Sequence, residues 1–329
     1  MSVEMTVLQA TTLAMARSMQ DDPAVMLLGE DVGVAGGIFR ATQGLQQRFG
    51  DQRVIDTPLD EKGIVAHAIG MALYGLRPIA EIQFSGFIHD AFEQIMFCGT
   101  KYRWITGGEY TCPMVVRAPS FGGIKGGFWH SQSPEAYFVH GGGMKVVCPS
   151  TPDDAYRLLL AAIADPDPVL VLEAVPLYRT LSGPVDDDGV AAVIGQAEVV
   201  RAGDEVTLVT YGPPRHLALQ AAEEMAELEQ ISIEVIDLRS LVPWDREAVS
   251  ASVRRTGRLV VLHEGPQTLG FGTEIVAAVQ EHDFGYLHCP IQRIAGHDMP
   301  YGFSIGDEHY RPNIDRIRAA VRRAMEYQF

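Results

Sequence analysis

The chain has 329 residues, 47% of them hydrophobic, which is enough to bury a large core in about two domains. Its formal net charge of −16 excludes binding to a nucleic-acid backbone, which needs a basic face, and is compatible with a basic protein partner. No apolar run approaches the roughly 20 residues that span a bilayer. The segment from Met1 to Leu8 lacks the features of a signal peptide, which predicts a cytoplasmic protein.

The cysteines predict reduced structural thiols. Cys98, Cys112, Cys148 and Cys289 lie far apart and form no Cys-x-x-Cys pair. A zinc site or a disulfide framework would show closer and more regular spacing. The sequence therefore gives no sign of a cysteine-based metal site.

The first part of the chain alternates predicted helices with short apolar strands. Helices are predicted from Thr6 to Met19, from Gly63 to Leu76 and from His89 to Trp104, and strands at Val25–Gly29, Pro78–Phe84, Met114–Arg117, Lys145–Cys148 and Val169–Glu173. This alternation indicates a parallel α/β sheet with helices on both faces. The helix from Gly63 to Leu76 is rich in small residues, which predicts close packing in an interface.

A domain boundary is predicted after residue 185. The stretch from Ser182 to Gly189 combines turn-forming residues with the solvated acids Asp186 to Asp188, as suits an exposed linker. The predicted domains are therefore 1–185 and 186–329. In the second, strands are predicted at Val206–Gly212, Ile231–Leu238 and Arg258–His263, and helices at His216–Glu229, Gly272–Glu281 and Ile314–Tyr327. This pattern predicts a smaller α/β domain.

Three stretches are hard to explain by packing alone. Asp56-Thr-Pro-Leu-Asp-Glu-Lys-Gly places Glu61 near a helix start, and Ala80-Glu-Ile-Gln-Phe-Ser-Gly-Phe runs from a strand into a loop. Gly127-Phe-Trp-His-Ser-Gln-Ser-Pro-Glu-Ala places His130 between aromatic residues and a polar turn. Taken alone, Glu61 is more often an acid stabilised by the helix dipole, and His130 a packed core histidine.

Together these stretches make the sequence resemble the β subunits of E1, the component of 2-oxo acid dehydrogenase complexes that acts on branched-chain 2-oxo acids or pyruvate. The resemblance covers essentially the whole chain. It is also carried by Leu28-Gly-Glu-Asp-Val-Gly, Lys101-Tyr-Arg, Val235-Ile-Asp-Leu-Arg-Ser-Leu-Val-Pro-Trp-Asp, Arg254-Arg-Thr-Gly-Arg and His263-Glu-Gly-Pro. Any one of these motifs is weak evidence, but this many in the right order are specific.

The resemblance implies an α/β fold of two domains. A pyrimidine-binding domain of the thiamine-diphosphate fold, with helices on both faces of a parallel sheet, is followed by a transketolase C-terminal-type α/β domain. Thiamine diphosphate is expected between this chain and an E1 α subunit, in an α2β2 heterotetramer. Glu30 and Asp31 would face the partner subunit, and Ala66 and Gly70 would allow close helix contact in the assembly.

The resemblance also implies two catalytic residues. Glu61 matches the family glutamate whose carboxyl group hydrogen-bonds the aminopyrimidine and promotes removal of the thiazolium proton. His130 matches the family histidine that transfers a proton during decarboxylation or acyl transfer, since its pKa lies near neutral. Leu59, Gln83 and Phe87 would complete the pyrimidine pocket. Phe87 stands where some branched-chain members have Tyr, so the phenyl ring can stack but offers no hydroxyl group.

Relatives hold a structural potassium ion largely through main-chain carbonyls. The matching segments here are Cys112-Pro-Met-Val and Ala162-Ile-Ala-Asp-Pro-Asp. The resemblance therefore implies a possible K⁺ site that involves Cys112, Met114, Val115, Ala162, Asp165 and Asp167. Asp165 is its expected side-chain ligand.

Two other readings stay open. A thiamine enzyme that works without a partner chain, such as transketolase, holds Mg²⁺ with a Gly-Asp-Gly and a later Asn. This sequence has no Gly-Asp-Gly, and its one Asn is Asn313. The Mg²⁺ ligands are therefore expected on the α subunit. A non-catalytic scaffold that only docks partners is an alternative of another class, against which Glu61 and His130 argue.

The predicted substrate is a branched-chain 2-oxo acid, with pyruvate as the alternative. The stretch His130-Ser-Gln-Ser-Pro-Glu-Ala looks more like branched-chain members, whereas the bulk of Phe128 and Trp129 would favour a smaller acyl group. The acyl group would pass to a lipoyl group of the E2 acyltransferase. The small basic subunit-binding domain of E2 is the second expected partner, and it would dock on the C-terminal domain.

Overall fold

The computed structural model describes residues 2–327, which form two compact units. The first unit contains residues 2–124 and 129–194, and the second contains residues 125–128 and 195–327. The units separate near residue 194, later than the predicted boundary at 185, because residues 186–194 bind back to the first unit.

The acids of the predicted linker make these contacts. The Tyr156 hydroxyl donates a hydrogen bond to Asp187 at 2.7 Å. Arg157 forms an ion pair with Asp188 at 3.1 Å. The prediction that these acids are merely solvated is therefore wrong for Asp187 and Asp188.

A parallel sheet forms the centre of the first unit. Its strands lie in the order β6-β7-β5-β4-β2-β3, and neighbouring strands pair in parallel register, as Leu27 does with Ile79. The strands read as nearly continuous apolar runs because both faces of the sheet are covered. They are β2 (Val25–Gly29), β3 (Val54–Asp56), β4 (Arg77–Glu81), β5 (Val115–Ser120), β6 (Lys145–Val147) and β7 (Val169–Ala174).

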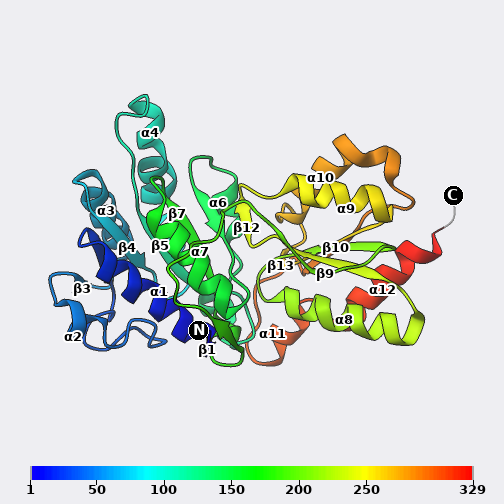
Figure 1. Ribbon diagram of the computed structural model, residues 1–329, viewed down its shortest axis with the longest axis horizontal. Coiled ribbons are helices and arrows are strands. Elements are labelled where there is room, and N and C mark those ends of the chain that lie inside the picture. The colour runs from blue at the N-terminus through cyan, green and yellow to red at the C-terminus, as the bar shows by residue number, and fades with distance from the viewer. Residues whose placement is uncertain (1, 328–329) are drawn as a thin grey trace. The chain divides into compact units, whose positions relative to one another are not determined.

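Helices cover the two faces of this sheet (Figure 1). On one face α1 packs against α7, and both contribute to an apolar core with β2, β5 and β7. On the other face α3 packs against β2 and β4. The α-helices of this unit are α1 (Val7–Asp21), α2 (Leu45–Phe49), α3 (Glu61–Leu73), α4 (Tyr102–Ile105), α6 (Glu135–Val139) and α7 (Pro152–Ala164), and α5 (Gly127–His130) ends in it.

The single helix predicted from His89 to Trp104 is wrong. The chain instead forms short turns of changing pitch: η1 (Ile88–Ala91), η2 (Gln94–Cys98), η3 (Gly99–Lys101) and then α4. A Cβ at Gly99 would lie 2.6 Å from the terminal methyl group of Met114, so a larger residue there would require the Met114 side chain to move. The changes of pitch interrupt a regular helix.

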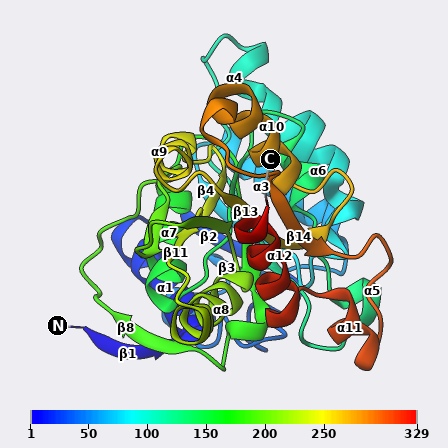
Figure 2. The ribbon, with the colours of Figure 1, turned by 90° about the vertical axis from the view of Figure 1, so that its right-hand side faces the viewer.

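The N-terminal segment closes the first unit. Strand β1 (Val3–Thr6) pairs antiparallel with β8 (Ser182–Val185), so that Val3 lies beside Val185 (Figure 2). Thr6 then caps α1, since its hydroxyl accepts the Gln9 amide at 3.2 Å while the Gln9 side chain accepts the Thr6 amide at 2.9 Å. This reciprocal pair satisfies two amides at the helix start.

The second unit is a smaller sheet with helices on both faces. Its strands lie in the order β14-β13-β10-β11-β9, and β9 alone pairs antiparallel with its neighbour. One face packs against α8 and α12, and α9 and α10 contact the sheet through β10 and β13 (Figure 1). The elements of this unit are β9 (Glu198–Arg201), β10 (Val206–Thr210), β11 (Ile233–Asp237), β12 (Ser240–Val242), β13 (Leu259–Pro266), β14 (Gln292–Gly296), α8 (Pro214–Glu229), α9 (Arg246–Thr256), α10 (Gly272–Asp283), η5 (Phe284–Tyr286), α11 (Ile305–Tyr310) and α12 (Ile314–Glu326). The short turn η4 (Val175–Leu177) belongs to the first unit.

The predicted class and most predicted elements agree with this structure. Strand β2 has the predicted bounds, and α3 begins two residues earlier than predicted, at Glu61. Within residues 2–327, no helix has the length and apolar content needed to cross a membrane.

Candidate active site

Glu61 is the first residue of α3. The Asp60 side chain caps this helix by accepting the Gly63 amide at 2.8 Å, so the direction of the first turn is fixed. The Glu61 side chain is half-buried, and no hydrogen bond from residues 2–327 reaches its carboxylate. A carboxylate at this end is stabilised by the helix dipole and still has its lone pairs available for a ligand.

A second carboxyl group lies near Glu61. Burial raises the pKa of Glu30, and the negative charges of Asp31 and Glu61 raise it further. Glu30 follows β2, whereas Glu61 begins α3, so two separate elements bring these acids together. The like charges around Glu30 therefore favour its protonated form.

The loop after β4 carries Gln83 and Phe87. Its backbone is fixed from β5, because the Ser85 amide donates to the Pro119 carbonyl at 2.8 Å. The Ser85 hydroxyl also donates to the Gln132 carbonyl at 3.1 Å. These bonds join the loop to the segment that carries His130.

His130 contacts two aromatic rings of that loop, which also contact each other. Its ring centroid is 4.6 Å from Phe84 and 5.5 Å from Phe87, with both pairs close to perpendicular. Gly86 allows this approach, since a Cβ there would lie 2.0 Å from the Trp129 carbonyl oxygen. The structure thus places the predicted residues Phe87 and His130 in contact.

The start of α3 lies beside the same region. Helix α3 packs against η1, the turn that follows Phe87. The Lys62 ammonium group forms an exposed ion pair with Glu93 at 3.2 Å. Glu61, Phe87 and His130 therefore belong to neighbouring elements at the carboxyl edge of one sheet, where ligands bind in open α/β folds. Leu59 is different, because 71% of it is exposed.

Some members of this cluster were not singled out from the sequence. Phe84 was included in a motif but given no role, although its ring is the nearer of the two to His130. Gly86 likewise has no side chain to suggest a role. The resemblance predicts that Glu30 faces a partner subunit. Its position directly after a buried strand is the sequence feature that could have placed it near the site.

The predicted potassium site consists mainly of carbonyl groups that already accept hydrogen bonds. The Met114 amide binds the Cys112 carbonyl at 2.8 Å, and the Val169 amide binds the Met114 carbonyl at 3.0 Å. The Ala162 carbonyl accepts an amide at 3.3 Å, and Val115 pairs with strands on both sides. Each carbonyl can accept a second contact, so these groups neither require nor exclude an ion.

The acids of this predicted site are already neutralised. The Lys145 ammonium group lies 2.5 Å from Asp165, and Arg103 lies 2.7 Å from Asp167. These cations supply the charge that K⁺ would bring, so the side chains do not favour an ion there. Throughout residues 2–327, no group of three or more His, Cys, Asp or Glu side chains is arranged to hold a metal. The potassium ion stays a prediction.

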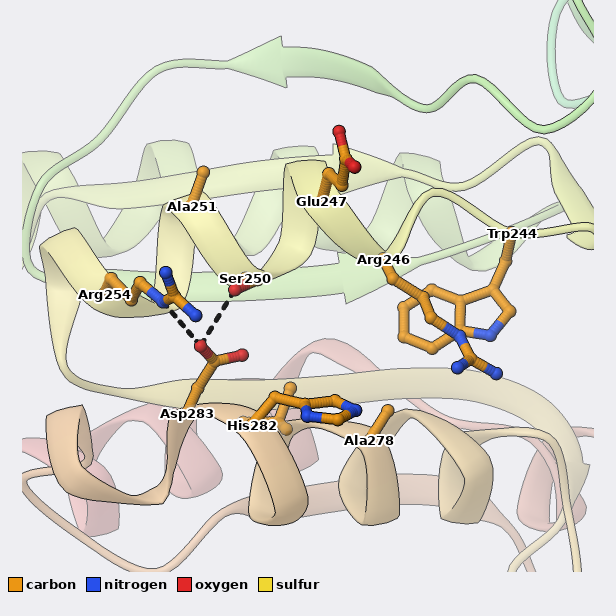
Figure 3. A pocket seen from close by; sticks show the side chains of 10 residues that line it. Trp244, Arg246, Glu247, Ser250, Ala251, Arg254, Ala278, His282 and Asp283 are labelled. Carbon is orange, nitrogen blue, oxygen red and sulfur yellow. Dashed lines mark hydrogen bonds and ion pairs between the residues drawn. The ribbon is translucent and has the colours of Figure 1, made fainter.

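A separate groove lies in the second unit between α9 and α10 (Figure 3). It encloses about 450 Å³. Asp283 at its edge accepts bonds from Ser250 at 2.8 Å and from Arg254 at 2.6 Å, and Arg246 lies over the Trp244 ring at 5.4 Å. None of the predicted site residues lines this groove, so it is distinct from the cluster around His130.

Comparison with known proteins gives the family. The model described as "Transketolase, pyrimidine binding domain" matches residues 3–180, and "Transketolase, C-terminal domain" matches residues 195–317. The β subunit of 2-oxoisovalerate dehydrogenase from Bacillus subtilis is 44% identical over 98% of this chain and 99% of its own length. The chain belongs to the E1 β subunits of the 2-oxo acid dehydrogenases.

Other relatives of this E1 β subunit agree with that placement. The β subunit of 3-methyl-2-oxobutanoate dehydrogenase from Mycobacterium tuberculosis is 46% identical over 98% of this chain and 92% of its own. The β subunit of the pyruvate dehydrogenase E1 component from Bacillus subtilis is 39% identical over 98% of this chain and 99% of its own. The family prediction is confirmed.

A solved structure supports the fold of this E1 β subunit. It is titled "Split gene transketolase, inactive beta4 tetramer" and has a TM-score of 0.80, with 22% identity over 98% of each chain. At this identity the likeness concerns the fold alone. The prediction of a pyrimidine-binding domain followed by a transketolase C-terminal-type domain is confirmed.

Proposed function

We propose that this E1 β subunit works with an α subunit in a thiamine-diphosphate-dependent enzyme, which decarboxylates a branched-chain 2-oxo acid and transfers the acyl group to a lipoyl group of E2. The observation that carries the proposal is the Glu61 carboxylate, which begins α3 and accepts no hydrogen bond from residues 2–327. Helix α3 packs against η1, the turn that follows Phe87, so this carboxylate is available to a ligand near the predicted pocket.

The residues of this chain fit the aminopyrimidine half of the cofactor. Glu61 would bind a ring nitrogen, Phe87 would stack on the ring, and Gln83 and Leu59 would complete the pocket. The exposure of Leu59 suits a residue that is covered only when the α subunit and the cofactor are present. Bound thiamine diphosphate supplies the electron sink for decarboxylation.

The diphosphate half is proposed to belong to the α subunit. This chain has no Gly-Asp-Gly, and Asn313 caps α12 by accepting the Arg316 amide at 2.9 Å. The one asparagine therefore has a structural role that leaves it unsuited to hold Mg²⁺. The magnesium ligands would come from the partner chain.

In this mechanism the protein side chains move and hold protons. Glu61 would hold the proton that is shared with the pyrimidine ring nitrogen. His130 gives or takes a proton at the substrate or the lipoyl group. The rings of Phe84 and Phe87 hold the orientation of His130.

The branched-chain substrate is supported by the names of relatives that are 44% and 46% identical, against 39% and 43% for two pyruvate enzyme subunits. Trp129 is 55% exposed in this chain, so its ring does not by itself fill an acyl pocket. Steady-state assays of the reconstituted enzyme should give a higher kcat/KM on 3-methyl-2-oxobutanoate than on pyruvate. The reverse order would assign the chain to the pyruvate enzymes.

The E2 partner is proposed to bring a small basic domain. The net charge of −16 on this chain would speed such an encounter, and salt would screen it. The C-terminal unit is the proposed docking surface.

The central test replaces Glu61 with Gln. The amide has nearly the size of the carboxyl group but cannot exchange the proton, so Glu61→Gln should slow hydrogen–deuterium exchange at the thiazolium carbon by on the order of 10²–10⁴. The measurement uses the enzyme reconstituted with its α subunit. Lys62→Gln is a matched control at the next position, where the side chain binds Glu93 on the surface. Unchanged exchange in Glu61→Gln would remove Glu61 from the mechanism.

A further inference from the structure

A charged cluster lies inside the apolar sheet of the first unit. Arg117 on β5 is fully buried and reaches Glu81 on β4 at 2.6 Å. On its other side it makes two bonds of 2.8 Å to Glu173 on β7. Such paired bonds between a guanidinium and a carboxylate fix the geometry of both groups.

The Tyr178 hydroxyl completes this cluster by donating to Glu173. Burial raises the pKa of Tyr178, so the phenol stays a neutral donor. Burial also raises the pKa of Glu81, which favours one proton on two acids that share one guanidinium. The cluster is thereby close to neutral, and Tyr178 is tied to three strands through it.

From Tyr178 a series of aromatic contacts runs to His130. The Tyr178 ring lies 5.5 Å from Phe39, Phe39 lies 5.2 Å from Phe84, and Phe84 lies 4.6 Å from His130. Each contact is edge-to-face, with interplanar angles of 69°, 70° and 89°. This is a favoured arrangement for aromatic pairs.

Phe39 itself is held at both its ring and its backbone. Arg179, next to Tyr178, donates to the Phe39 carbonyl at 3.1 Å. Two residues earlier, Gly37 has a φ of 77° and lies so close to the cluster that a Cβ would be 3.1 Å from the Glu81 carboxyl. The loop after β2 therefore lies close to Glu81 at Gly37 and contacts Tyr178 of the cluster through the Phe39 ring.

We propose that Phe39 is a positioning residue for His130 and acts through the ring of Phe84. Rotation about the bond to an imidazole ring has a broad energy minimum, so contacts with neighbouring rings contribute to setting the plane of His130. Phe84 faces that ring from one side, and Phe39 and Tyr178 keep Phe84 in place. This inference rests on the proposed role of His130.

The test compares Phe39→Leu with Phe39→Tyr in the enzyme reconstituted with its α subunit. Leu keeps an apolar side chain but has no ring edge, whereas Tyr keeps the ring. Phe39→Leu should lower kcat by about 2-fold to 10-fold, the range that one aromatic contact provides. The KM for the 2-oxo acid and the Kd for thiamine diphosphate should stay within about 2-fold. Phe39→Tyr should keep kcat near the wild-type value.

Phe49→Leu is the matched control. Phe49 packs on the same apolar core as Phe39, but its ring contacts the guanidinium groups of Arg48 and Arg53. It should lose stability without a loss of kcat. An unchanged kcat in Phe39→Leu, or an equal loss in both Leu variants, would overturn the proposal.

A second readout does not depend on turnover. In enzyme with ¹³C-labelled histidine, the His130 ring signal is identified by its absence in His130→Ala, and Phe39→Leu should shift it while Phe49→Leu should not. Phe39→Met takes the place of Phe39→Leu if the Leu variant does not fold. If the His130 signal is not shifted in the Phe39 variant, the positioning role is overturned. Full kcat in His130→Ala would instead overturn the proposed function of His130, so the two failures are distinguishable.

Discussion

Gly86 sets the distance between two parts of the site. The atom that a Cβ would meet there, at 2.0 Å, is the backbone oxygen of Trp129, which cannot rotate away as a flexible side chain can. Any larger residue must therefore displace either the loop after β4 or the segment that carries His130. The contacts of His130 with Phe84 and Phe87 depend on that short separation.

Gly86→Ala should consequently lower kcat by on the order of 10²-fold, the cost expected when a catalytic group moves by about 1 Å. Steady-state turnover of the reconstituted enzyme measures this effect. Gly285→Ala is a suitable control, because a Cβ at that position meets no atom within 4 Å. Wild-type turnover in Gly86→Ala would show that this backbone contact does not position His130.

At the scale of single residues, the sequence predicts side chains with a chemical role better than it predicts the residues that position those side chains. Glu61 and His130 were named from motifs because their chemistry is in the side chain. Phe84 and Phe39 act through contacts between distant segments, and no local spacing reports which rings will meet. The buried Arg117 cluster left one signal, a buried charged residue within each of three largely apolar strands.

Helix α3 presents two different faces. Ile64, Val65 and Ala68 are buried against the sheet, whereas Ala66 and Gly70 are exposed. The exposed face also includes His67 and Tyr74 and forms a shallow apolar groove. The small-residue pattern that predicted an interface therefore lies on the side that this chain leaves uncovered.

Gly70→Leu should block the heterotetramer without unfolding this chain. A Cβ at Gly70 meets no atom within 4 Å, and replacing a helical glycine should stabilise the isolated chain by about 0.5–1 kcal/mol. Light scattering of the protein co-expressed with its α subunit reports assembly, and urea unfolding reports stability. Gly285→Leu serves as the control. A normal tetramer with Gly70→Leu would place the interface elsewhere.

Regular elements were easier to predict than irregular ones. The bounds of β2 follow from a short apolar run, and α1 and α12 from helical spacing. The region from residue 88 to 105 has apolar residues at helical spacing too, yet its pitch changes from η1 to η2, η3 and α4. Both η1 and η2 pack against α3, which lies elsewhere in the sequence, so local periodicity contains no information about these contacts.

His263 makes the stability of the second unit depend on pH. Its ring is fully buried and lies parallel to Tyr211 at 6.1 Å. Burial and the positive charge of Arg293 lower the pKa of His263 to about 4. The unfolded chain takes up this proton near pH 6.5. The contribution of His263 to stability is therefore complete above that pH and is lost as the pH falls toward 4.

The expected loss between pH 7 and pH 5 is about 2 kcal/mol from this residue. Urea unfolding at the two pH values measures it, and His263→Gln should show a correspondingly smaller change because Gln does not titrate. His282→Gln controls for loss of a histidine, since that side chain is 63% exposed. Equal pH dependence in the wild type and in His263→Gln would show that His263 does not titrate as expected.

The pairing of β1 with β8 has a consequence for how the protein forms during synthesis. The two strands are separated by nearly the whole first unit, and α1 also packs against α7, which is almost as distant along the chain. At about 5–20 residues per second, a ribosome needs roughly 10–40 seconds to make the intervening chain. During that interval α1 emerges with Ala10, Ala14 and Met15 unprotected, although all three are fully buried in the finished unit. Helix α1 thus remains exposed until some of the last parts of its domain have been made, and during that interval a chaperone has the largest apolar surface to protect.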